Sequence, residues 1–182
     1  MNRLPKDIHP HLAWLACLHA IHRKVRREGF LAIEADVSSP DLEGSLFREF
    51  PHVLRQPYLG FATDILRLML MGLQDPDELS VYAEHAIAGL TKRRYFRRAD
   101  ETLLRTIWLT LWALAKGLAP GVASEFGRQA MPVRIKPTAD ELEAWLSEIE
   151  AGRRQQTEDA RVEEEGIEAV VDRFMASIEG KD

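Results

Sequence analysis

Apolar residues recur every three or four positions along most of this chain, and proline or glycine separates one such stretch from the next. That spacing marks one face of an α-helix, whereas β-branched residues nowhere alternate with polar ones over a useful length. With 182 residues, 46% of them hydrophobic, the chain can bury one sizeable core. The pattern predicts an all-α fold: a compact domain of about six to seven short and medium helices, plus a C-terminal amphipathic helix.

The first predicted helix runs from about Pro10 to Glu28. Its apolar face carries Trp14, Leu18, Ile21 and Val25. Gly29 is a natural stop or kink, and residues 30–37 predict one or two further helical turns. After a break at residues 38–40, a short helix is expected to open at Pro40 and Asp41 and to end before Pro51.

Proline, aspartate and threonine mark the starts of the later helices. Pro57 is expected to begin a helix that Gly72 closes, and Asp75 caps one that Pro76 begins. A long helix is predicted from Asp100 to about Gly117, and a short one from Pro120. Pro132 and Pro137 bracket an extended stretch, and Thr138 with Glu141 forms a capping box for the helix that follows.

The domain is expected to cover residues 1–151, followed by an acidic linker and tail helix over 152–182. The tail stripe comprises Ile167, Val170, Val171, Phe174 and Ile178. Residues 1–98 carry a net charge of +2 and residues 99–182 one of −7. This asymmetry favours a solvated acidic tail over a charged docking face.

Two apolar runs, Leu12–Ala20 and Ile107–Ala115, fall short of the roughly 20 residues that a membrane-spanning helix needs. The single cysteine, Cys17, permits no internal disulfide and fits a reducing compartment. The sequence therefore predicts a soluble, cytoplasmic chain with no transmembrane segment.

Two separated segments resemble the cytoplasmic portions of MotA, the ion-channel subunit of the flagellar stator. The first comprises residues 26–34, Ser39-Pro40, Phe50-Pro51 and residues 64–72; it is similar to the loop between the family's second and third membrane helices. The second comprises residues 119–128, 136–138 and 141–143, and resembles the segment after the last membrane helix. The matches keep the family's order and cover roughly residues 15–150.

The departures from the family are as informative. Nothing before Leu12 could hold the first two membrane helices, and only nine residues lie between Leu90 and Asp100, where the third and fourth should be. The resemblance thus implies a stator module that binds proteins and conducts no ions, with its two segments still packed together. Whether it is a natural paralogue or an engineered deletion, and its oligomeric state, stay open.

The resemblance also implies a binding face. In the family, charged residues of this loop face the rotor switch protein FliG, and by resemblance Arg26 and Glu34 occupy those positions, with Arg27 adjacent. On a continuous helix the two charges would fall on similar sides and form a dipolar patch. The alternative is that these charges only solubilise helix faces. The family's acidic cluster is reduced here to Glu84, which leaves the partner, rotor or stator subunit, open.

Five basic residues around two aromatic ones form a second candidate surface, called here the basic link: Lys92, Arg93, Arg94, Arg97 and Arg98. It fits contact with anionic lipid, which would place the chain at the inner face of the membrane, or contact with nucleic acid, which the net charge of −5 disfavours. The third interpretation, which assigns no binding function, is a solvated linker. A cytosolic scaffold or peripheral-membrane interaction protein unrelated to motility is the alternative function.

Enzyme, metal and cofactor signals are weak. The chain contains no nucleophile elbow, P-loop, dinucleotide fingerprint or paired-histidine zinc motif. Nothing in the sequence places Asp64 and Glu125 together as a carboxylate pair. The histidines of the first helix (His9, His11, His19 and His22) have no carboxylate or cysteine at a familiar ligand spacing. We expect no catalysis, metal or cofactor, and we expect the four tryptophans to act as core or interface anchors.

Overall fold

The computed structural model describes residues 9–54, 58–92 and 98–155, with side chains described from residue 101 in the last range. The all-α prediction is confirmed, since this part of the chain contains helices and no strand. The α-helices are α1 (Pro10–Glu28), α2 (Glu34–Ser38), α3 (Pro51–Leu54), α4 (Leu59–Leu70), α5 (Pro76–Thr91), α6 (Arg98–Ala115), α7 (Pro120–Gln129) and a last one over residues 139–155. Three 3₁₀ turns are η1 (Phe30–Ile33), η2 (Leu46–Glu49) and η3 (Val133–Ile135).

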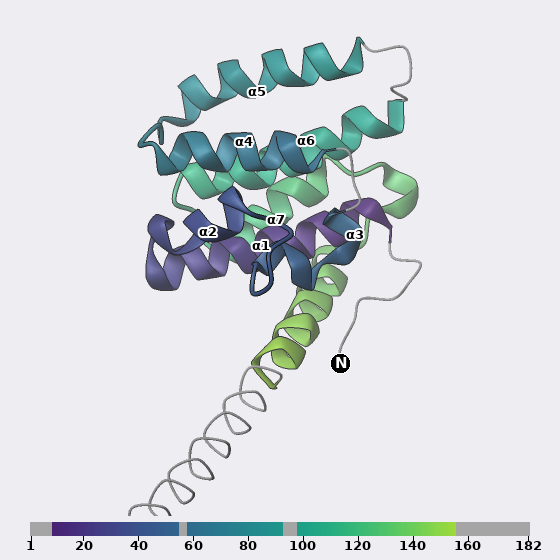
Figure 1. Cartoon of the computed structure of the whole chain (residues 1–182). Helices are drawn as coiled ribbons and strands as arrows, with labels where there is room; N and C mark the ends of the chain where they lie inside the picture. The colour runs from purple at the N-terminus through teal and green to yellow at the C-terminus, as the bar shows by residue number, and fades with distance from the viewer. Residues whose placement is uncertain (1–8, 55–57, 93–97, 156–182) are drawn as a thin grey trace, which may run out of the picture. The chain divides into compact units, whose positions relative to one another are not determined.

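Helix α1 (purple in Figure 1) contacts α3, α6, α7 and the turns η1 and η2. The sequence predicts a helix with one apolar face, but every residue of α1 from His11 to His22 except Leu12 is buried. Small side chains at Ala13, Ala16, Cys17 and Ala20 let neighbouring elements approach it closely. The histidines His11, His19 and His22 are themselves buried.

Helix α6 packs against helices that precede and follow it in the chain. Helix α6 contacts α1, α4, α5 and α7, and α7 contacts α1. Trp112 of α6 covers α7, with its ring centroid 5.4 Å from that of Phe126. Trp14 and Trp108 are almost fully buried, which confirms their expected place in the core.

Local signals placed most helix ends correctly. Asp75 caps α5 by accepting the Asp77 amide at 2.8 Å, and Pro76 is the first residue of that helix. Thr138 and Glu141 form the expected capping box, since the Glu141 carboxylate accepts the Thr138 amide at 2.7 Å and the Thr138 hydroxyl accepts the Glu141 amide at 3.2 Å.

Two predictions between residues 40 and 137 were wrong in detail. No α-helix opens at Pro40; residues 40–45 form turns and are followed by η2, with Gly44 at φ +85°. The stretch between Pro132 and Pro137 contains η3 and is not extended throughout. Residues 40–45 include proline, aspartate, glycine and serine, which favour turns, so the helix signal at Pro40 was overruled locally. Pro57 lies outside the described residues.

Contacts divide the chain into two compact units, one of residues Leu4–Leu146 and one of residues Met1–Arg3 and Ser147–Asp182. Helices α1 to α7 all lie within the first unit. The predicted tail stripe lies outside the described residues, and the expected division after residue 151 stays a prediction. None of the described helices combines the length and hydropathy that crossing a bilayer requires.

Candidate functional site

The predicted charged face lies at the corner where α1 ends and α2 begins. Gly29 follows α1 with φ +86° and ψ 170°, a backbone conformation that favours glycine. The 3₁₀ turn η1 then leads into α2, whose first residue is Glu34. Arg26 and Glu34 therefore do not share a continuous helix. The prediction that they form a dipolar patch on one helix is wrong.

The side chains of Arg26, Arg27 and Glu34 are all exposed. The Arg26 guanidinium donates to the Gly117 carbonyl at 3.3 Å, next to the end of α6. Arg27 pairs with Glu28 at 2.6 Å. Two arginines at the last turn of α1 suit the negative end of the helix dipole, so part of their role is structural. We call Arg26, Arg27 and Glu34 the corner face.

Asp36 connects the elements that meet at this corner. Its side chain is buried, and its two carboxylate oxygens have different partners. Oδ1 accepts the Leu46 amide at 2.7 Å, and Oδ2 receives the Lys24 ammonium at 2.8 Å. One carboxylate thereby links α1, α2 and η2. Charge-assisted bonds to a buried carboxylate are stronger than neutral ones, so Asp36 fixes how α2 leaves the corner.

Replacing Asp36 with alanine should lower the free energy of unfolding by about 2 kcal/mol, because it leaves the Leu46 amide buried without a partner and removes the Lys24 ion pair. Urea unfolding followed by circular dichroism measures this loss. The exposed Asp41, five residues away, gives a matched control: Asp41→Ala should stay within about 0.5 kcal/mol of wild type. Equal losses of unfolding free energy in both variants would show that the contacts of Asp36 do not stabilise the fold.

The basic link can be placed only in part. Lys92 is exposed directly after α5, and Arg98 is the first residue of α6. Arg93, Arg94 and Arg97, and the side chain of Arg98, lie outside what the structure describes. The interpretations as a lipid contact, a nucleic-acid contact and a solvated linker stay predictions.

The histidines of α1 belong to its packing. His11, His19 and His22 are buried. His11 Nε2 lies 3.3 Å from Thr102 Oγ1, and His19 Nδ1 lies 3.0 Å from Ser124 Oγ. Neither ring nitrogen of His22 has a hydrogen-bond partner. Within the described residues, no group of three or more histidine, cysteine or acidic side chains is placed to hold a metal ion.

Burial controls the protonation of two of these rings. It lowers the pKa of His11 to about 4, with a smaller contribution from His9. Burial also lowers the pKa of His22 to about 4; the nearby backbone of Leu118 opposes the shift without making a well-directed hydrogen bond, and His19 and Arg26 add to it. Both rings are therefore neutral at pH 7.

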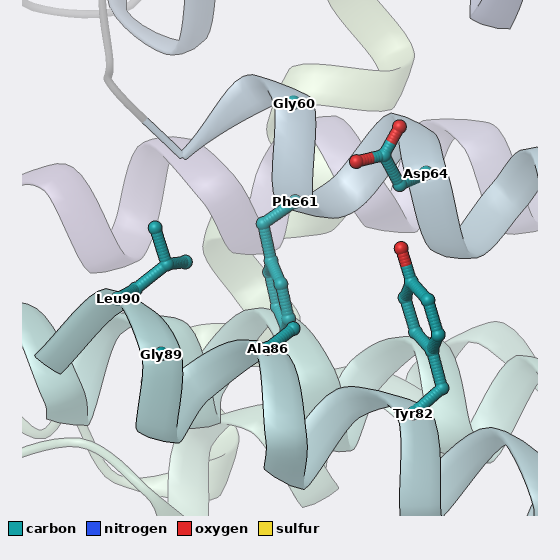
Figure 2. A pocket seen from close by; sticks show the side chains of 7 residues that line it. All are labelled: Gly60, Phe61, Asp64, Tyr82, Ala86, Gly89 and Leu90. Carbon is teal, nitrogen blue, oxygen red and sulfur yellow. The ribbon is translucent and has the colours of Figure 1, made fainter.

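A hollow of about 420 Å³ opens between α4 and α5 (Figure 2). Helix α4 contributes Gly60, Phe61 and Asp64, and α5 contributes Tyr82, Ala86, Gly89 and Leu90. The small residues at positions 60, 86 and 89 leave the space between the helices unfilled. This hollow was not predicted from the sequence, in which small residues spaced along two apolar helix faces were the available signal.

Asp64 and Glu125 have different partners and form no pair. Asp64 lies 3.8 Å from Arg67 on α4. Glu125, on α7, accepts hydrogen bonds from Arg128 at 2.6 Å and from Gln129, and these bonds lower its pKa. Asp64 and Glu125, the two carboxylates considered as an acid–base pair, thus lie on different helices with different partners.

Comparison with known proteins gives no relative: no protein-family model, curated protein or solved structure matches the chain.

Proposed function

We propose that the chain is a non-catalytic protein-binding module that resembles the cytoplasmic part of the flagellar stator subunit MotA. It would bind motor components, either the rotor switch protein or stator subunits, through the corner face, and conduct no ions. The observation that carries the proposal is the exposure of Arg26, Arg27 and Glu34 on a corner that the buried Asp36 holds in place. Charges fixed on a rigid scaffold can steer a partner of complementary charge.

The packing of the fold supports the same proposal. Helix α7, which carries most of residues 119–128 of the second segment, packs directly against α1, whose last residues begin the first segment. Arg26, the first residue of the first segment, donates to the Gly117 carbonyl at 3.3 Å, two residues before the second segment begins. A binding face at Arg26 therefore lies next to the part of the chain that leads into the second segment.

The double variant Arg26→Ala/Glu34→Ala should lose at least about tenfold in affinity for its partner, as expected for removal of two rim charges that steer association. A pull-down with purified FliG and with detergent-solubilised stator complex tests this. Arg134→Ala/Glu143→Ala is a matched control, since it removes one exposed basic and one exposed acidic residue elsewhere in the same unit.

Binding by wild type and control, with loss in the corner variant, supports the proposal. If all three proteins bind the partner equally well, the partner does not bind at the corner face. Circular dichroism of each variant shows that a loss does not come from unfolding, since the side chains that are replaced are exposed.

A further inference from the structure

The hollow between α4 and α5 combines an apolar wall with a single charge. Phe61, Ala86 and Leu90 supply apolar surface, and Asp64 is the only charged residue in the lining. Figure 2 shows the Tyr82 ring rising from α5 with its hydroxyl toward the Asp64 carboxylate, and the Phe61 ring descending from α4 beside it. A volume of about 420 Å³ is within the range of small-ligand sites.

Asp64 is available to a ligand. Its side chain is 51% exposed, and its ion pair with Arg67 is long, at 3.8 Å, between two solvent-exposed groups. Such pairs contribute little to stability and are easily exchanged for another partner. A cation placed in the hollow would be near this carboxylate and near the aromatic rings of Phe61 and Tyr82, and carboxylates and aromatic rings both attract positive charge.

We propose that the hollow binds small organic ammonium ions that carry a short apolar or aromatic group. The ammonium would pair with Asp64, and the apolar group would fill the space that Gly60, Ala86 and Gly89 leave between the helices. Charge complementarity selects this class: the lining offers no cation to an anionic ligand, and a neutral ligand would leave the carboxylate unused. The site is independent of the corner face.

Phenethylammonium is a suitable probe, with 2-phenylethanol as its neutral counterpart and 3-phenylpropionate as the anionic one. The open form of the hollow and the few atoms of the probe set an expected Kd on the order of 1 mM. Titration of the ¹⁵N-labelled full chain by NMR should shift the amide signals of the lining glycines Gly60 and Gly89. The alcohol should bind about tenfold more weakly, and the carboxylate should not bind.

Two variants separate the charge from the cavity. Asp64→Asn should weaken phenethylammonium about tenfold and remove its preference over the alcohol. Gly89→Leu should abolish binding of both, because position 89 faces open space and a leucine there fills the hollow without strain. Asp77→Asn removes an exposed carboxylate of α5 outside the lining and serves as the control, which should bind as wild type does.

The variant Arg67→Gln is a further test, since removal of the guanidinium that competes for Asp64 should strengthen ammonium binding. Equal affinity for the three probes, or unchanged binding by Gly89→Leu, would overturn the proposal. Failure here would leave the proposed function untouched, because the corner face shares no residue with the hollow.

Discussion

Lowering the pH from about 7.5 to about 5 should remove about 4 kcal/mol from the free energy of unfolding, through two buried histidines. In the unfolded chain, His11 and His22 take up protons near their ordinary pKa of 6.5, whereas in the folded chain burial lowers both pKa values to about 4. Between these values the unfolded state binds more protons, so stability falls as the pH falls. Each ring contributes about 2 kcal/mol at pH 5.

Urea unfolding at a series of pH values measures this slope. The double variant His11→Gln/His22→Gln should lose most of the dependence above pH 5, whatever its stability at pH 7.5, because glutamine does not titrate. The comparison of slopes isolates the two rings from any packing defect. Carboxylates with lowered pKa values, such as Glu125, act below this window. A double variant with the wild-type slope would show that other groups cause the acid sensitivity.

Gly127→Ala should destabilise the fold by about 3 kcal/mol, because α7 approaches α6 and α1 most closely at this glycine. A Cβ atom there would lie 2.6 Å from Leu15 Cδ2 and 3.1 Å from the Thr106 carbonyl, and it would overlap the Thr110 hydroxyl. Thr110 cannot turn away freely, because its hydroxyl donates to the Thr106 carbonyl at 2.9 Å and its side chain is buried. The methyl group therefore pushes α7 away from two helices at once.

Gly121→Ala is the matched control for this substitution. Gly121 lies on the same helix, is exposed, and has no atom within 4 Å of an added Cβ. Alanine has the higher helix propensity, so this variant should be unchanged or more stable by up to about 1 kcal/mol. Thermal unfolding of both variants decides the question, and equal stability of the two would contradict the close packing of α7.

The sequence predicted the fold class and most helix ends because those depend on neighbouring residues. Asp75 with Pro76, and Thr138 with Glu141, act within a single helical turn, and the bonds they predict are present. The break at Gly29 was expected for the same reason. What the sequence left open was its geometric consequence: the separation of Arg26 and Glu34 depends on the φ of one residue.

The features that the sequence could not give depend on distant residues. His11, His19 and His22 are buried on α1, and Thr102 and Ser124, about a hundred positions away, supply partners to His11 and His19. Asp36 carried no signal in the sequence, since its acceptor role depends on the turn that presents the Leu46 amide. Close approach at Gly127 and the α4–α5 hollow likewise arise only when helices pack.

The affinity of the full chain for FliG at two salt concentrations tests most directly whether the corner face binds a motor protein through its charges. Biolayer interferometry at about 50 mM and about 300 mM NaCl should give binding that weakens at least about tenfold with salt in the wild type, because screening reduces attraction between exposed charges. The same measurement on Arg26→Ala/Glu34→Ala should show weak binding with little salt dependence. Absence of binding by the folded wild type at low salt, to FliG and to the stator complex alike, would contradict the claim.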